Sequence, residues 1–280
     1  MEIESRIEAV REEPDYAGEV FTEERRERGA HRAFVGGLWD QHGKTQLDYL
    51  VSQGLRPDHH FLDVGAGAFR AGRHLIDYLE PGHYYGIDIN KSLLEVGYEH
   101  ELSDEQRAKL PIGNVHATDR FDADFGDVRF DMAIAQSVFS HISLNNARVC
   151  LHRVAKVMKP GGRFFVTFFE GPEGTPIDKM LTKPRRFHER NPYWYTRSDM
   201  RWVARNEPWR MRYIGNWGHP AGQRMLEYTR LTEEEYAAKL ARQGGNRASA
   251  GRPAPAPESR PAAIAAAAAL ARRVRRRLGR

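Results

Sequence analysis

The 280-residue sequence has almost no cysteine and no long apolar segment. Cys150 is the only cysteine, which excludes an intramolecular disulfide and a cysteine-clustered metal site and is typical of a reducing compartment. No run of eighteen apolar residues occurs, and the N-terminus is acidic where a secretory signal would be basic and then apolar. We therefore expect neither secretion nor a membrane span, and a cytoplasmic location.

Metal-ligand patterns are also lacking. None of the twelve histidines belongs to a His-x-Glu-x-x-His pattern or a similar ligand spacing. The segment 136–145, which follows a predicted strand, offers no carboxylate that could hold magnesium. The sequence predicts no metal site.

An excess of positive charge is lacking outside the C-terminal tail. Residues 241–280 contain ten arginines and one acid. Although the formal charge of the chain is +5, the remaining body, residues 1–240, therefore contains 33 basic and 37 acidic side chains. A mildly acidic body disfavours nucleic acid as a partner. Contact of the basic tail with a membrane is the less favoured alternative to a solvated, frayed helix.

Composition divides the chain into three parts. Residues 1–30 are rich in Glu and Arg and predict a charged arm, loosely docked or partly disordered, with little chemistry. Residues 31–240 predict one folded domain. Residues 241–280, rich in Pro, Ala and Arg, predict a largely disordered tail.

Short apolar runs alternate with helical patterns between these ends, as in a doubly wound, mostly parallel α/β sheet. The predicted strands are 60–64, 84–89, 115–117, 131–135 and 163–169, and the predicted helices are near 70–78, 91–100 and 144–158. The Pro-Gly-Gly sequence at 160–162 is expected to stop the last of these helices.

The strongest local feature is a glycine-rich turn after the first predicted strand. The segment 61–67 reads Phe-Leu-Asp-Val-Gly-Ala-Gly and leads into a helix, so Gly65 and Gly67 allow a ligand close to the backbone. The second strand ends at Asp88, where a carboxylate can bind a ribose diol. Arg70 stands where a dinucleotide fingerprint has its third glycine, which disfavours pyrophosphate binding and a nicotinamide-dependent dehydrogenase.

The pattern resembles the class I S-adenosylmethionine-dependent methyltransferases. The motifs that carry the resemblance are Asp-Val-Gly-Ala-Gly at 63–67, the acid Asp88, the strand 130–135 and Lys-Pro-Gly-Gly-Arg-Phe at 159–164. The resemblance implies a seven-stranded Rossmann-like sheet with a cofactor-binding half over about 58–170. A closing half over about 171–240 would include an antiparallel hairpin, 209–214 with 225–228. The sequence departs from the family at Phe69, where many members carry a third glycine.

The resemblance also implies a set of cofactor contacts. Gly65 and Gly67 would pass under S-adenosylmethionine, Asp63 would hold its amino-acid end, and Asp88 would bind its ribose. Asp119 matches the family's adenine-contacting acid, with Asp122 as a rival. Gln136, at the end of the fourth strand, is also expected at the cofactor.

Two side chains are candidates for a general base. His141 follows the fourth strand at the carboxyl edge of the sheet, where open α/β sheets bind ligands. It could equally hydrogen-bond the backbone and pack under the cofactor. Glu170, at the end of the fifth strand, faces the same edge and is the second candidate.

An aromatic segment predicts the acceptor pocket. His188, Tyr193, Trp194 and Tyr195 would suit a sugar ring or a planar aromatic molecule. The alternative is a small auxiliary core that precedes a helix capped by Thr196. The segments 35–40 and 216–220 are candidates for a lid.

These features predict an enzyme that methylates a hydroxyl of a saccharide or related small polar metabolite. The alternatives are an N-methyltransferase of a small molecule and a catalytically silent protein that binds a partner.

Overall fold

The structure is a computed structural model that describes residues 15–177, 179 and 191–250, with side chains up to 243. The chain divides into two units, Met1–Tyr236 and Ala237–Arg280. Helix α10, Glu233–Ala250, spans their boundary. The sequence predicts a largely disordered tail over 241–280; helix α10 includes residues 241–250, and the prolines begin only at Pro253.

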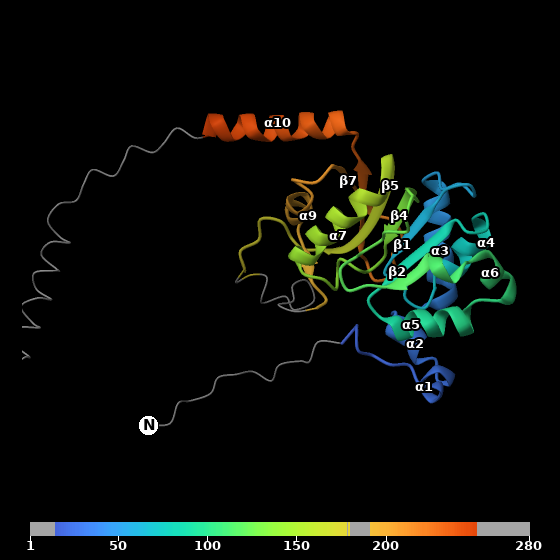
Figure 1. Ribbon diagram of the computed structural model, residues 1–280. Coiled ribbons are helices and arrows are strands. Elements are labelled where there is room, and N and C mark those ends of the chain that lie inside the picture. The colour runs from blue at the N-terminus through green and yellow to red at the C-terminus, as the bar shows by residue number, and fades with distance from the viewer. Residues whose placement is uncertain (1–14, 178, 180–190, 251–280) are drawn as a thin grey trace, which may run out of the picture. The chain divides into compact units, whose positions relative to one another are not determined.

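A mixed sheet forms the centre of the first unit (Figure 1). Its strands follow the order β3-β2-β1-β4-β5-β8-β7, and β6 pairs with β5. Strands β1 to β5 pair in parallel, whereas β8 is antiparallel to both β5 and β7. The bounds are β1 (Phe61–Val64), β2 (Tyr84–Asp88), β3 (Val115–Ala117), β4 (Phe130–Ala135), β5 (Met158–Glu170), β6 (Trp194–Tyr195), β7 (Trp209–Asn216) and β8 (Arg224–Arg230). The mostly parallel sheet and its closing hairpin are confirmed, and β6 is an addition to the seven expected strands.

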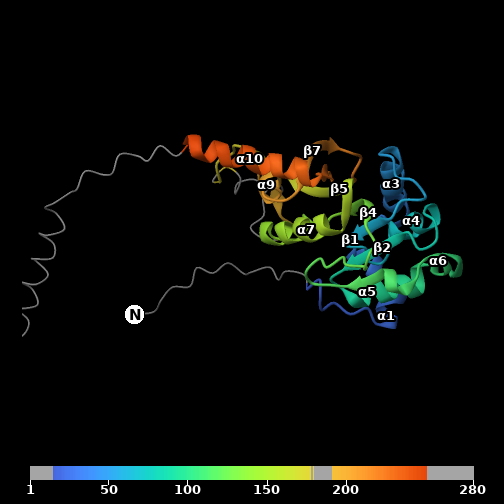
Figure 2. The same ribbon diagram turned by 45° about the horizontal axis from the view of Figure 1, so that its top comes forward.

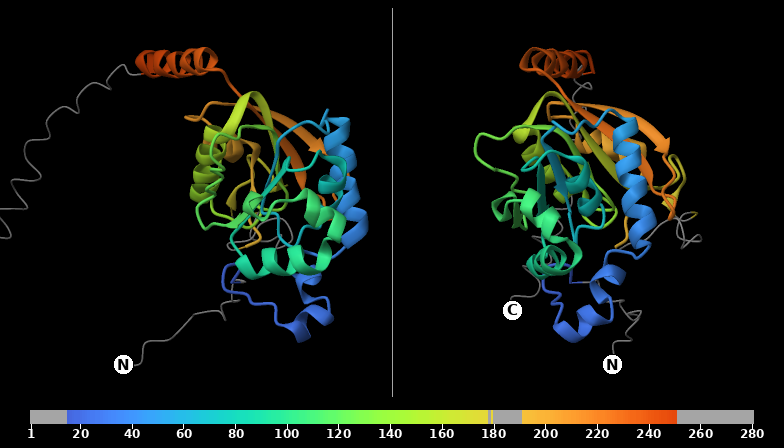
Figure 3. Two further views of the ribbon diagram at one scale, coloured as in Figure 1. Left: turned by 45° about the vertical axis from the view of Figure 1, so that its right-hand side comes forward. Right: turned by 90° about the vertical axis from the view of Figure 1, so that its right-hand side faces the viewer.

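Helices cover both faces of the sheet. Figures 2 and 3 show α7 on one face and α3 with α4 on the other. The α-helices of the first unit are α1 (Glu23–Glu27), α2 (Ala30–Phe34), α3 (Trp39–Ser52), α4 (Gly72–Tyr78), α5 (Lys91–Val96), α6 (Asp104–Lys109), α7 (Leu144–Val157) and α9 (Arg197–Val203). A π-helical turn, Gly97–Glu101, follows α5 within the helix predicted at 91–100.

Alternate residues of the strands enter two different cores. On β1, Leu62 and Val64 pack with α7 and α9, whereas Phe61 packs with α3 and α4. This alternation is the period of two that a strand imposes, and burial on both faces explains why the central strands read as continuous apolar runs.

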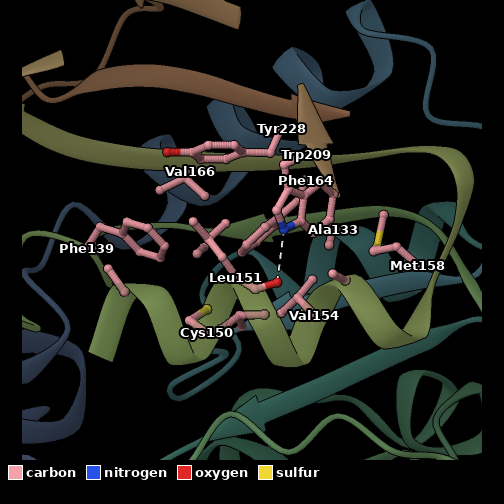
Figure 4. Packing of buried hydrophobic residues seen from close by; sticks show 14 of the residues in the cluster. Ala133, Phe139, Cys150, Leu151, Val154, Met158, Phe164, Val166, Trp209 and Tyr228 are labelled. Atoms are coloured by element: carbon pink, nitrogen blue, oxygen red, sulfur yellow. Dashed lines mark hydrogen bonds between the residues drawn. The ribbon is translucent and has the colours of Figure 1, made fainter. Parts of the chain in front are cut away.

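Helix α7 shows how the sheet is covered (Figure 4). Leu151 and Val154 are fully buried against the strands, and the Trp209 indole N–H donates to the Leu151 carbonyl over 2.9 Å. Ser143 caps the helix, since its side chain accepts from the Asn146 N–H.

The Pro-Gly-Gly segment differs from its prediction. Helix α7 ends at Val157, before this segment, and residues 160–162 lie within β5. The pairing of β4 with β5 shifts register between Phe130 and Met132, so the strand accommodates the proline and glycines at an irregularity.

Candidate functional site

A cavity of about 610 Å³ lies where β1, β2 and β4 end. Open α/β sheets bind ligands beyond these carboxyl ends. The wall is completed by Tyr16 and Phe34 near the N-terminus, by α3, and by the turn between β7 and β8. The described segments therefore assemble the cavity from parts of the chain that are far apart in sequence.

The glycine-rich turn has the backbone that its residues predict. Gly65 and Gly67 have φ values of 81° and 56° and line the cavity. A Cβ on Gly65 would lie 2.4 Å from Val138 Cγ2, so only glycine fits there. Phe69, the departure from the three-glycine pattern, also has a positive φ, 63°. A buried aromatic residue thus holds the left-handed conformation that favours glycine, a strain typical of functional sites.

Three acids line the cavity: Asp63, Asp88 and Asp119. The Asp88 carboxylate accepts from the Gly67 and Asn90 N–H groups, each over 2.8 Å. It therefore clamps the glycine turn to the end of β2. Burial raises the pKa of Asp88 despite these bonds. Burial raises the pKa of Asp63 to about 7, although Tyr84 donates to it over 2.8 Å. The rival acid Asp122 is not among the lining residues.

Gln136 and Gln223 connect the end of β4 to β8. The Gln223 carbonyl oxygen accepts from the Thr167 hydroxyl over 2.6 Å, and its amide donates to Ser137 over 3.1 Å. Gln136 donates to Ser137 over 3.0 Å, but its own Oε1 is buried without a donor among the described residues. Both glutamines line the cavity, so this unpaired acceptor belongs to a side chain of the cavity wall.

His141 lines the same cavity and is clamped by Asn191. The histidine Nδ1 contacts the Asn191 side-chain oxygen and lies 3.1 Å from the Tyr16 hydroxyl. An amide oxygen only accepts, so Nδ1 carries the proton and Nε2 has the free electron pair. Burial lowers the pKa of His141, which keeps the ring neutral near pH 7.

Glu170 is not brought to the cavity wall. Its carboxylate accepts from Arg197 Nε over 2.5 Å and from the Tyr213 hydroxyl over 2.6 Å, and it lies 3.6 Å from Arg224. Glu170, the second candidate for a general base, is therefore engaged by two guanidinium groups and a phenol hydroxyl. These contacts tie β5 to α9 and to the closing hairpin.

The aromatic segment lies behind the cavity rather than on its surface. Trp194 stacks on Phe169 with ring centroids 4.8 Å apart, and Phe169 is the ring that lines the wall. Tyr195 donates to the Ile142 carbonyl over 2.7 Å and stacks with Tyr193. None of the three predicted aromatics is a lining residue. His188 lies outside the described residues.

The alternative interpretation of this segment is supported in part. Thr196 and Asp199 form a capping box at the start of α9. Buried Met200 and Val203 of that helix join the core on the α7 side. Tyr195 belongs to this same core and Tyr193 packs against it, so the segment extends the main core rather than forming a separate one, and Trp194 supports Phe169.

The N-terminal segment supplies residues that sequence reasoning missed. The Asn90 amide donates to the Tyr16 and Glu19 carbonyls, both over 2.9 Å. Phe21 packs with Trp39 and Leu93 in a separate buried cluster. The sequence predicts little chemistry before residue 30, yet Tyr16 contacts both the cavity and His141.

The residues that the structure describes form neither a metal-ligand cluster nor a helix that could span a membrane. They contain no group of three or more His, Cys, Asp or Glu side chains that could hold a metal ion. No helix among them is long and apolar enough to cross a membrane.

Comparison with known proteins agrees with this geometry. Residues 62–164 match a sequence family described as a methyltransferase domain. O-methyltransferase cnsE of Penicillium expansum is 26% identical over 159 residues, which cover 52% of this chain and 55% of that protein. Phosphoethanolamine N-methyltransferase 2 of Caenorhabditis elegans is 30% identical over 130 residues, which cover 46% of this chain and 28% of that protein. The chain thus spans about half or less of the length of these relatives.

The fold is also similar to a solved structure. Human N-acetylserotonin methyltransferase in complex with S-adenosylmethionine aligns with a TM-score of 0.53 and 18% identity. The alignment covers 77% of this chain and 60% of that one.

Proposed function

Because the chain belongs to the Rossmann-like S-adenosylmethionine-dependent methyltransferases, we propose that it methylates a hydroxyl group of a small polar acceptor, such as a saccharide. The relatives include O- and N-methyltransferases, so the choice of a hydroxyl rests on the site itself. The observation that carries it is a neutral, clamped histidine in the cavity wall, His141.

The residues present fit S-adenosylmethionine. A Cβ on Gly65 or Gly67 would lie 2.4 or 3.1 Å from Val138 or Val35, so the turn is a cradle that side chains would fill. Asp88 would hold the ribose. Asp63 and the free oxygen of Gln136 would hold the ammonium of the amino-acid end, since both oxygens can accept from N–H donors.

When bound, the cofactor supplies a methyl group on a positively charged sulfur. Methyl transfer then needs an aligned acceptor, exclusion of water and, for a hydroxyl, removal of a proton. Asn191 holds the proton on His141 Nδ1, so Nε2 is the atom that takes the acceptor's proton. The lowered pKa keeps Nε2 unprotonated at neutral pH.

The distribution of acids favours a hydroxyl over a cationic amine. The three carboxylates that line the cavity are Asp63, Asp88 and Asp119, all assigned to the cofactor. The side chains that contact His141, those of Tyr16 and Asn191, are neutral. An alkylammonium acceptor would lack a carboxylate partner there, and burial of an unpaired charge is unfavourable.

The test is methyl transfer to a panel of sugars, phenols and primary amines. His141→Ala should reduce turnover of the hydroxyl acceptor about a hundredfold or more and leave the affinity for S-adenosylhomocysteine unchanged by calorimetry. His152→Ala, at an exposed ion pair with Glu207, is the matched control.

Full activity of His141→Ala, or transfer to amines alone, would contradict the proposal. Tight binding of S-adenosylhomocysteine without transfer to any acceptor would favour the catalytically silent alternative.

A further inference from the structure

Four polar rings, two of them buried (His42 and Trp217) and two half-buried (Tyr49 and His219), form a contiguous group between α3 and the turn that joins β7 to β8. The centroids of His42 and His219 are 4.8 Å apart. Trp217 lies 6.0 Å from His42 and 5.6 Å from His219, and Tyr49 lies 5.2 Å from Trp217. The two histidines line the cavity, as does Arg70, so the group forms one wall of the site described above.

This group holds a concentration of unsatisfied polar atoms. Both ring nitrogens of His42, Nε2 of His219, the indole nitrogen of Trp217 and the hydroxyl of Tyr49 are buried without a partner among the described residues. Buried polar groups are nearly always hydrogen-bonded, and each exception needs an explanation. His42 is only 4% exposed, so solvent does not supply its partners.

Each of the two histidines has an unsatisfied N–H donor. His219 Nδ1 accepts from the Ala221 N–H over 3.0 Å, so Nε2 carries the ring's proton. Burial and the nearby charge of Arg70 lower the pKa of His42 to about 3 and that of His219 to about 4. Both rings are therefore neutral at pH 7, and each offers one N–H.

Arg70 adds the only full positive charge to this wall. Its guanidinium donates to the Val35 and Gly37 carbonyls. None of the ion pairs within 4.0 Å among the described residues includes it. Asp63 is the acid whose charge acts on Arg70. Because no described carboxylate lies within ion-pair distance of its guanidinium, the wall offers N–H donors around a cation that a ligand can contact directly.

We propose that His42, His219 and Arg70 form a binding subsite for a carboxylate. A planar carboxylate matches the donor geometry of a guanidinium, and one negative charge balances the single cation. A phosphate dianion would exceed that charge. The inference rests on the proposed function, because the carboxylate would belong to the acceptor or to the amino-acid end of the cofactor.

Calorimetry can separate these two sources. The probes are S-adenosylhomocysteine, 5′-methylthioadenosine, which lacks the amino-acid end, and benzoate added to the protein saturated with S-adenosylhomocysteine. The variants are His42→Leu and His219→Leu. His219→Gln retains a side-chain N–H donor and should restore binding in part. His74→Leu is the control, because its Nε2 is also buried without a partner but the residue does not line the cavity.

If the subsite holds the cofactor's carboxylate, both leucine variants should bind S-adenosylhomocysteine about tenfold more weakly or worse, with unchanged affinity for 5′-methylthioadenosine. If it holds the acceptor's carboxylate, cofactor affinity should be unchanged, and benzoate should bind the wild-type complex but about tenfold more weakly to the variants. Since His219 lies on a turn rather than in a helix, its two variants keep the test valid should His42→Leu fail to fold.

Unchanged binding of all three probes in folded variants, or an equal loss in His74→Leu, would overturn the subsite. Failure of the wild-type protein to bind either adenosine compound would instead overturn the proposed function. The two failures are therefore distinguishable.

Discussion

Replacing Asp63 by Asn should stabilise the ligand-free protein, and more so at high pH. The carboxylate is 4% exposed and raised in pKa from 3.8 to about 7 by burial. An amide oxygen could still accept the 2.8 Å hydrogen bond from Tyr84. The substitution therefore removes a buried charge and keeps the hydrogen bond from the Tyr84 hydroxyl.

The magnitude follows from proton linkage. The folded state binds this proton more tightly than the unfolded chain does. Stability is therefore unaffected by the group below pH 3.8, falls as the pH rises from 3.8 to about 7, and is constant above that. Each pH unit in this window corresponds to about 1.4 kcal/mol. Between pH 5 and pH 8 the wild-type protein should lose about 3 kcal/mol that Asp63→Asn retains.

Urea unfolding at pH 5 and pH 8 measures this difference, and any pH-independent effect of the new amide cancels in the comparison. Asp48→Asn, on the exposed side of α3, is the matched control and should change the unfolding free energy by less than about 0.5 kcal/mol at either pH. Equal effects of Asp63→Asn at both pH values would refute the argument that burial raises the pKa of Asp63. The same variant should bind S-adenosylhomocysteine more weakly, since its amide cannot offer a charge to the cofactor's ammonium.

Three further substitutions test the framework of the site. Asp88→Asn leaves one of the two bonded backbone N–H groups, that of Gly67 or that of Asn90, facing an amide donor. It should lower the unfolding free energy by about 1–3 kcal/mol and weaken cofactor binding by a similar amount; an unchanged melting temperature and affinity would exclude the clamp. Gly97→Ala would place a Cβ 2.6 Å from the Ala68 Cα, so it should lower the melting temperature and cofactor affinity together, and a loss of neither would contradict the close approach. Trp209→Phe removes the donor to the Leu151 carbonyl and should cost about 1–3 kcal/mol by urea unfolding, without any change in cofactor affinity.

The part of the site that could be predicted from sequence is the part made of neighbours in sequence. Asp63, Gly65 and Gly67 follow one strand, Asp88 ends the next, and all four line the cavity. Parallel strands have their carboxyl ends at one edge of the sheet. A glycine or an acid that directly follows such a strand is therefore predicted to lie at that edge. The same logic places Gln136 at the end of β4.

The remainder depends on contacts that no local pattern encodes. Tyr16 reaches His141 across 125 positions of sequence, and Asn191 reaches it across 50. Glu170 is a further example. Its position at the end of β5 was predicted, but its ion pair with Arg197 depends on how α9 packs. The position of a residue along a strand can be predicted from the sequence. The hydrogen-bond or ion-pair partner of its side chain cannot.

This difference also indicates where acceptor specificity resides. The residues that clamp the cofactor turn bond to backbone groups, as Asp88 does with Gly67, so their substitution should disturb the turn itself. The residues that contact His141 come instead from the N-terminal segment and from the stretch near Asn191, and the turn with His219 lines the same cavity. Each of these is an irregular segment outside the pairing of β1 to β5, so its side chains can change without altering the sheet. A related chain with the same glycine turn but a different residue at position 16 or 191 should therefore keep the cofactor and change the acceptor.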